Sequence, residues 1–290
     1  MRRSLVLDLD ASVTGMPDAA CVPLREHEES IRFACSLRQL QSLVEEIEQP
    51  LEDNNGVVML GSGDFHHVSF ALIERVARFR PVEVIVLDNH PDNMRWLGDI
   101  HCGSWVRHAA RLRNVIHVHV LGITSTDIGP GQLWENYFTP LLRGRLTYWS
   151  VGQSFNWMHR LGWRDAFRNF ATPAQLCEAF AHEQSKATHP VYFSIDKDVM
   201  SPDLVACNWD QGCFTEQHIE SILGTVQGRI VASDITGELS DYRYRTNWKR
   251  WLSARDAQPV VDVHGLSREQ DRHRQVNARL VARIDQAMTP

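Results

Sequence analysis

The sequence predicts an α/β protein: a single domain over residues 1–290 with a three-layer α/β/α fold and a mostly parallel sheet of about eight strands. Two observations lead to this prediction. Short apolar runs rich in β-branched residues alternate with amphipathic segments of helix length, which is the order found in parallel sheets. In addition, no linker rich in Gly, Ser or Pro and no repeat of about 20 to 50 residues divides the chain.

Seven apolar runs are the candidate strands. They begin at Leu5 (LVLDL), Val57 (VVML), Val82 (VEVIVL), Val115 (VIHVHVL), Leu146 (LTYWSV), Val191 (VYFSI) and Arg229 (RIVAS). An eighth strand could begin at Val260 (VVDV). Because most of these runs are apolar throughout, we expect helices to cover both faces of the sheet.

Four amphipathic segments between the strands are the candidate helices. They span residues 28–48, 68–79, 172–185 and 215–227. Thr172 and Thr215 precede the last two and predict helix N-caps, because a threonine hydroxyl can accept a hydrogen bond from a free backbone N–H. The final stretch, RHRQVNARLVARIDQAM, has helical periodicity and is expected to pack on the sheet or against another subunit.

Composition excludes several classes of protein. Hydrophobic residues make up 43% of the chain and charged residues 23%, which is the composition of a folded domain rather than a disordered one. The formal net charge of −6 disfavours a nucleic acid or an anionic membrane as partner. We therefore assign the basic aromatic stretch 241–251 to a subunit contact or to an anionic end of a substrate.

The N-terminus carries no signal-peptide pattern, because Asp8 and Asp10 interrupt its apolar run. No apolar run reaches the roughly 18 residues that a membrane-spanning helix needs. We expect a cytoplasmic protein whose cysteines are reduced, and no two of them form a C-x-x-C pair that would indicate a zinc ribbon.

Polar residues crowd the positions that follow the predicted strands. The segments are GSGDFHHVS (61–69), DNHPD (88–92), SIDKD (194–198) and SDITGE (233–238). Open parallel sheets place their ligand sites at the carboxyl ends of the strands, so these segments should meet. Residues at alternate positions of an extended chain point to one side, which brings together the side chains of 88, 90 and 92, and those of 196 and 198.

This gathering of acidic side chains predicts a metal centre. Two histidines and four carboxylates at one sheet edge would repel each other strongly if empty, whereas two divalent cations would cancel the four negative charges. Carboxylate-rich donor sets suit harder ions with five or six ligands, such as Mn²⁺, rather than structural zinc. Two such ions about 3.5 to 4 Å apart would share a water and lower its pKa, which is hydrolytic chemistry.

The motifs resemble those of the arginase, agmatinase and formimidoylglutamase group, the binuclear manganese ureohydrolases. Members of that family carry Gly-Gly-Asp-His, Asp-x-His-x-Asp, Ser-x-Asp-x-Asp and a later acidic residue, in the order seen here over residues 61–238. The resemblance implies that Asp88 and Asp196 bridge two Mn²⁺ ions, with His66 and Asp92 completing one site. His90 and Asp198 would complete the other.

The first motif departs from the family, because Phe65 separates the aspartate from the histidine. Either His66 or His67 could then be the metal ligand. We choose His66, because Ser69 stands three residues later, where the family has a hydroxyl residue.

The resemblance also implies catalytic roles for three residues. Glu238 would hold the guanidinium group, although its spacing from Asp234 is one residue longer than in the family and Asp234 remains the alternative. His101, in HCGSW, resembles a histidine that passes a proton to the leaving amine, and Asp198 could relay the same proton. His117 and His119 lie inside a strand and are expected to pack rather than to bind metal.

The predicted function is hydrolysis of a C–N bond in a guanidino, amidine or formimino compound, by attack of a metal-bridging hydroxide that releases urea or a related small amide. The resemblance implies a homo-oligomer, a trimer or hexamer. Two alternatives remain: a deacetylase-like hydrolase of the same fold that binds one zinc, and a non-catalytic binding module. Retention of Asp92 and Asp198 favours two metals, whereas the insertions at Phe65 and Cys102 and the shifted Glu238 favour the module.

Overall fold

The computed structural model describes residues 2–16, 18–129, 131–153, 162–163, 165–255 and 263–289. The possible strand at Val260 falls mainly on residues 260–262, outside the described residues. The final helical stretch is part of a helix that begins at Val263. None of the helices in the described ranges is both long and apolar enough to cross a membrane.

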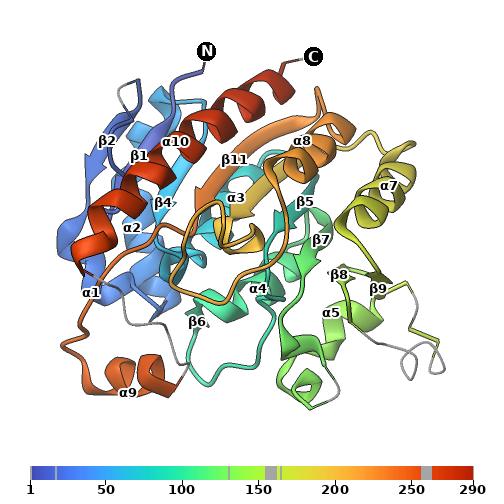
Figure 1. The fold of residues 1–290 in the computed structure, drawn as a ribbon, viewed down its shortest axis with the longest axis horizontal. Coiled ribbons are helices and arrows are strands. Elements are labelled where there is room, and N and C mark those ends of the chain that lie inside the picture. The colour runs from blue at the N-terminus through green and yellow to red at the C-terminus, as the bar shows by residue number, and fades with distance from the viewer. Residues whose placement is uncertain are drawn as a thin grey trace.

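A parallel sheet of nine strands forms the centre of the molecule (Figure 1), so the predicted fold class is confirmed. Its order is β2-β1-β4-β11-β10-β5-β7-β8-β9. The strands span Leu5–Asp8 (β1), Ala20–Pro23 (β2), Val58–Gly61 (β4), Val82–Leu87 (β5), Val115–Ile123 (β7), Leu146–Val151 (β8), Phe167–Phe170 (β9), Val191–Asp196 (β10) and Ile230–Thr236 (β11). A separate antiparallel pair joins β3 (Ala34–Cys35) to β6 (Ile100–His101).

The two edge strands, β2 and β9, were not predicted. The residues of β2 alternate between half-buried and exposed, and three of the four residues of β9 are only half-buried. Neither has the continuous apolar character of the central strands, because each has a neighbour on one side only. These two segments are extended because β2 pairs with β1 and β9 pairs with β8.

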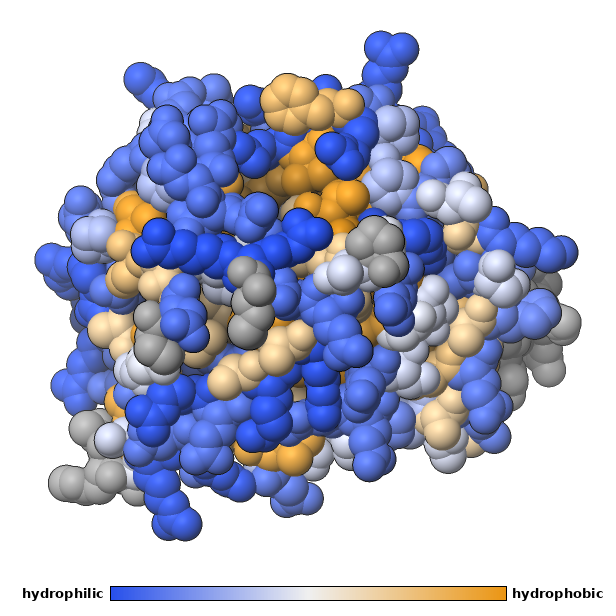
Figure 2. Space-filling view, turned by 90° about the horizontal axis from the view of Figure 1, so that it is seen from above, coloured by the Kyte–Doolittle hydropathy of each residue, from blue (hydrophilic) through white to orange (hydrophobic). Residues whose placement is uncertain are grey.

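Helices cover both faces of the sheet (Figure 1). One core contains residues of α2, α3 and α4, and the other contains residues of α7, α8 and α10. The helices span Glu28–Ile31 (α1), Leu37–Asp53 (α2), Val68–Ala77 (α3), Trp105–Arg111 (α4), Phe138–Leu142 (α5), Pro173–Gln184 (α7), Glu216–Thr225 (α8), Asn247–Arg255 (α9) and Val263–Ala287 (α10). The face seen in Figure 2 is mainly hydrophilic, with hydrophobic residues confined to small areas.

The prediction of one helix over 28–48 was wrong, because the chain breaks into α1 and α2. Phe33 has a positive φ of 69°, and Ser36 starts the second helix by accepting a hydrogen bond from Gln39 N. The cause is tertiary: the break directs Arg32 into the interior, where it binds carboxylates described below. Of the predicted N-caps, Thr172 accepts from Gln175 N, and Thr215 stands at the N-cap position of α8.

Candidate metal centre

The three predicted ligand motifs follow strands that lie close together in the sheet, in the order β4-β11-β10-β5. His66 follows β4, Asp88 directly follows β5, and Asp196 ends β10. Because parallel strands all end at the same edge, the topology brings together side chains that are more than 100 residues apart in the sequence.

The structure gathers the predicted ligands into two groups that share Asp88. In the first, ligand atoms of His66, Asp88 and Asp196 lie within 4.8 Å of one another, and in the second, those of Asp88, His90 and Asp198 do so. Asp92 joins the first group through a distance of 3.1 Å from its Oδ2 to His66 Nδ1. All six predicted metal-binding residues therefore lie at one place.

The backbone at Gly237 passes close to the Asp196 carboxylate. Gly237 has a positive φ of 88°, and a Cβ there would collide with Asp196 Oδ1. A side chain at this position would both strain the backbone and displace the carboxylate. Asp198 N donates to Asp196 Oδ1 at 3.0 Å, which leaves Asp196 Oδ2 facing His66 Nδ1 at 3.5 Å.

His66 is the histidine that reaches the carboxylates. Its Nδ1 lies 3.2 Å from Asp88 Oδ2, yet neither of these two atoms has a hydrogen-bond partner among the described residues. Its Nε2 contacts Ser194 Oγ at 3.1 Å. The alternative, His67, is fully buried, and burial together with the charge of nearby groups lowers its pKa to about 3.

His90 binds a carboxylate with each ring nitrogen. Its Nδ1 lies 2.8 Å from Asp198 Oδ2, and its Nε2 lies 2.8 Å from Asp210 Oδ1. Asn89 Nδ2 also donates to Asp210 Oδ2 at 3.1 Å. Asp210 was missed from the sequence, since nothing in its local pattern points to a histidine 120 residues away.

Asp92 adopts a left-handed conformation with φ of 45°, which aspartate tolerates better than most residues. Trp105 Nε1 donates to its Oδ2 at 2.6 Å, and the backbone N of Val106 donates to its main-chain oxygen at 2.9 Å. The start of α4 thus holds the Asp92 carboxylate in place, and Trp105 is a second residue that the sequence did not predict.

Burial and mutual repulsion dominate the electrostatics of the carboxylates. Burial, with the nearby charge of Asp88, raises the pKa of Asp92 and that of Asp198 to about 7 each. Burial and the charge of Asp198 raise the pKa of Asp196 well above its usual range. The carboxylates shift the pKa of His66 upward despite its burial. Such a set is stabilised by added positive charge.

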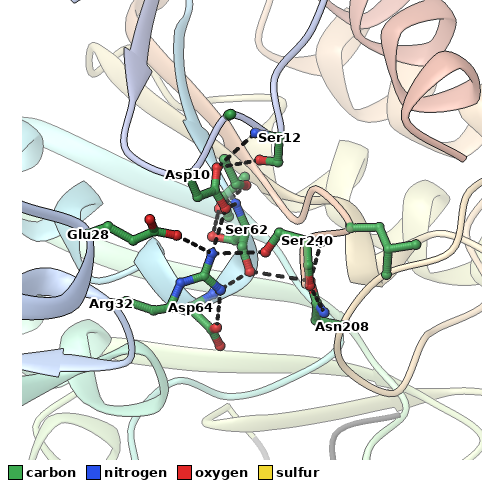
Figure 3. A network of polar contacts seen from close by, with 12 residues as sticks. Asp10, Ser12, Glu28, Arg32, Ser62, Asp64, Asn208 and Ser240 are labelled. Atoms are coloured by element: carbon green, nitrogen blue, oxygen red, sulfur yellow. Dashed lines mark hydrogen bonds and ion pairs between the residues drawn. The ribbon is translucent and has the colours of Figure 1, made fainter. Parts of the chain in front are cut away.

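An ion network centred on the buried Arg32 links loops that follow several strands (Figure 3). Arg32 Nη1 donates to Asp64 Oδ2 at 2.7 Å, and its Nη2 donates to Asp10 Oδ2 at 2.8 Å and to Ser240 Oγ at 2.9 Å. The guanidinium carbon lies 4.9 Å from the ring centroid of Phe65. The residue that departs from the family pattern is therefore packed against Arg32, which joins the segments after β1, β4 and β11.

A cavity of about 580 Å³ opens over the predicted metal-binding residues. Its wall combines aromatic rings with carboxylates, and among the lining residues are Phe33, Trp96, Trp209, Asp127, Glu135 and Asp210. His101 also lines it, with its ring 4.3 Å from that of Trp96. Burial lowers the pKa of His101 to about 3, so its imidazole is neutral at pH 7.

Glu238 does not line this cavity, so its placement does not support the predicted grip on a guanidinium group. It is 1% exposed and forms an ion pair with Lys197. Its other contacts are with α10: Asn277 Nδ2 donates to Oε1 at 2.7 Å, and His273 Nδ1 lies 3.2 Å from Oε2. The alternative, Asp234, is also buried away from the cavity and accepts a hydrogen bond from Ser194 Oγ at 2.7 Å.

His119 packs inside the fold, and His117 is half-buried beside it, with ring centroids 4.3 Å apart. His119 Nε2 lies 2.9 Å from Glu83 Oε1, and Trp149 Nε1 donates to His119 Nδ1 at 3.1 Å. His117 contacts Thr147 Oγ1 at 3.0 Å.

Comparison with known proteins bears on the fold. No family model matches the sequence. An uncharacterized protein from Thermotoga maritima is 28% identical over 211 residues, covering 72% of this chain and 68% of the relative. Arginase from Medicago truncatula superposes with a TM-score of 0.57 at 15% identity, over 99% of this chain and 87% of that one. Formiminoglutamase from Trypanosoma cruzi, solved with Mn²⁺, superposes with a TM-score of 0.52 at 13% identity, over 89% of this chain and 74% of that one. The chain therefore has the fold of arginase and formiminoglutamase, the ureohydrolase fold that its motifs predict.

Proposed function

We propose that this chain is a binuclear manganese-dependent hydrolase that cleaves a C–N bond in a guanidino or amidine compound. The observation that carries the proposal is the orientation of His66. Ser194 has a single hydroxyl proton, which it donates to Asp234 Oδ1, so its oxygen accepts from His66 Nε2–H. In the neutral imidazole, Nδ1 then presents a lone pair to three carboxylates, an arrangement that favours a cation between them.

His90 supports the same interpretation. With Nδ1 as a metal ligand, Nε2–H would donate to Asp210, and a carboxylate behind a ligating histidine fixes its tautomer and raises its basicity. The donors would be His66, Asp88, Asp92 and Asp196 for one ion, and Asp88, His90, Asp196 and Asp198 for the other, with Asp88 and Asp196 shared. These ligands are carboxylate oxygens and imidazole nitrogens without cysteine, which suits Mn²⁺.

When bound, two divalent ions supply Lewis-acid polarisation and lower the pKa of water toward neutrality. The residues of the chain would position the substrate and move protons. Asp127 and Glu135 line the cavity together with Trp96 and Trp209, and carboxylates beside aromatic rings are the chemistry that attracts a planar cation. The two carboxylates would take the role first predicted for Glu238. His101 and Asp198 both line the cavity and would be the groups that pass a proton to the leaving amine.

The proposal is tested by elemental mass spectrometry of protein expressed in manganese-supplemented medium. We expect close to two Mn²⁺ per chain, and urea or a related product in a screen of guanidino acids, guanidino amines and small amidines. Asp196→Ala should lose both metal and activity, whereas Asp203→Ala, which removes an exposed carboxylate outside the site, should keep both. One zinc per chain would favour the deacetylase-like alternative, and no metal after reloading would favour a binding module.

The same cavity indicates a small molecule as the ligand of this site. In the arginase-like fold the assembly would be a homo-oligomer, a trimer or a hexamer. Light scattering on the purified protein measures the number of subunits directly.

A further inference from the structure

A second cavity, of about 880 Å³, lies apart from the metal centre. Five arginines line it: Arg107, Arg111, Arg113, Arg143 and Arg145. The first two belong to α4, and the others lie in the turns that lead into β7 and β8. These turns are at the amino ends of the strands, whereas the metal-binding residues follow the carboxyl ends. The five residues are called the arginine cluster below.

The arginine cluster carries positive charge that no carboxylate of the described residues neutralises. Within the residues that the structure describes, none of the five forms an ion pair with an aspartate or glutamate, whereas elsewhere Arg279 and Arg283 both pair with Glu216. The chain as a whole is acidic, with a formal net charge of −6, so the excess of positive charge is local. Burial and the charges of Arg107 and Arg111 lower the pKa of the adjacent His108 to about 4.

Two members of the cluster are held in place without an anion. The guanidinium carbon of Arg107 lies 3.9 Å from the ring centroid of Tyr137, and Arg145 Nη2 donates to Leu112 O at 2.8 Å and also to Val115 O. The Nε atoms of both are buried, and neither has a hydrogen-bond partner among the described residues. Arg111, Arg113 and Arg143 are exposed and can close over a ligand.

We infer that the arginine cluster binds a small phosphorylated molecule that carries several negative charges. The planar guanidinium fork matches phosphate oxygens two at a time, and Arg111, Arg113 and Arg143 are the exposed members that can present such forks. Arg107 and Arg145 add positive charge that is already fixed in position, which lowers the entropy lost on binding. The cavity volume falls within the roughly 300 to 1,000 Å³ typical of small-molecule sites. A concave site of this size fits a sugar bisphosphate or a nucleotide better than the long groove along which a nucleic acid strand is tracked.

This site is independent of the proposed hydrolase function, because none of its residues is a predicted metal ligand. The two are nevertheless linked through α4. Trp105, the first residue of that helix, donates its indole N–H to Asp92, and the same helix carries Arg107 and Arg111.

The test is isothermal titration calorimetry of the metal-loaded protein at physiological ionic strength, with fructose 1,6-bisphosphate, ADP and inorganic phosphate as separate probes. We expect saturable binding of one of the first two at one per chain, and weaker binding of phosphate. Which of the two binds more tightly distinguishes a sugar phosphate from a nucleotide.

The variant Arg111→Gln/Arg113→Gln/Arg143→Gln changes only exposed side chains and should weaken that binding by about tenfold or more. The control Arg38→Gln/Arg272→Gln/Arg274→Gln removes the same charge from exposed positions elsewhere and should bind as the parent does. Equal weakening in both variants, or no binding of any probe, would overturn the inference. A third outcome would also overturn the inference. If the parent binds no anion, and light scattering shows that only the cluster variant loses its oligomers, the arginine cluster is a subunit interface.

Discussion

Ser194 sets the orientation of the His66 ring. Its Oγ lies 3.1 Å from His66 Nε2 and donates at 2.7 Å to Asp234 Oδ1, and Tyr192 donates to the other oxygen of the same carboxylate. All four side chains are buried. The chain Tyr192–Asp234–Ser194–His66 therefore determines which imidazole nitrogen faces Asp88, Asp92 and Asp196.

Replacing the Ser194 hydroxyl should weaken the first of the two proposed metal sites. We expect Ser194→Ala to lower metal affinity about 10- to 100-fold, as loss of a group that orients a ligating histidine does. At limiting Mn²⁺ the variant should hold fewer ions per chain than the parent. The matched control is Ser233→Ala, since the Ser233 side chain is equally buried and its Oγ makes no hydrogen bond within the described residues. Equal metal affinity in the two variants would contradict the orienting role.

Asp210 should have the corresponding effect on the second site. Removing the carboxylate that accepts from His90 Nε2 leaves the ring free to turn, so Asp210→Ala should also reduce metal affinity about 10- to 100-fold. The affinity is measured from the rise in the thermal unfolding temperature as Mn²⁺ is added. Asp203→Ala serves as the exposed control. If Asp210→Ala binds two ions with unchanged affinity, His90 does not depend on this partner.

Glu238 should act on stability rather than on substrate binding. Glu238→Gln leaves the ammonium group of Lys197 buried without its charged partner, and loss of one member of a buried ion pair typically costs about 3 to 5 kcal/mol of unfolding free energy. Urea denaturation measures the change. The double variant Lys197→Met/Glu238→Gln should recover much of it, because no buried charge remains unpaired. A raised KM for a guanidino substrate with unchanged stability would instead support the role predicted from the sequence.

Glu83 should make stability depend on acidic pH. Although burial raises its pKa, the hydrogen bond with His119 and the contacts with Gln184 and Arg229 lower the pKa to about 2, from 4.5 in an unfolded chain. A carboxyl with a depressed pKa in the folded state stabilises the fold above the unfolded pKa, and this contribution disappears as the pH falls through the folded pKa. The shift corresponds to about 3 kcal/mol at pH 7.

The measurement compares the parent with Glu83→Gln by urea denaturation at several pH values. The difference in unfolding free energy should shrink by about 1 kcal/mol at pH 4 and by about 2 kcal/mol at pH 3. Glu220→Gln, at an exposed position on α8, should show no such dependence. A difference that stays constant from pH 7 to pH 3 would mean that Glu83 titrates normally in the folded protein.

Features that repeat along the chain were open to prediction from the sequence. Apolar runs such as Val82–Leu87 identify buried strands, because a strand covered on both faces must be apolar throughout. The spacing of Asp88, His90 and Asp92 predicted that their side chains lie together, although they meet through bends and a left-handed Asp92 rather than along an extended chain. The parallel topology then predicts that residues following different strands meet at one edge.

Contacts between distant segments were decided by the tertiary structure. Lys197 stands between two predicted ligands, and only the docking of α10 and the end of β11 shows that Glu238 is its partner rather than a residue of the cavity. The pairing of His90 with Asp210, and of Arg32 with Asp64 and Asp10, has the same origin. Sequence patterns carry the local requirements of strands and ligand motifs, whereas the partner of a buried charge depends on which segments the packed core brings within a few ångströms of it.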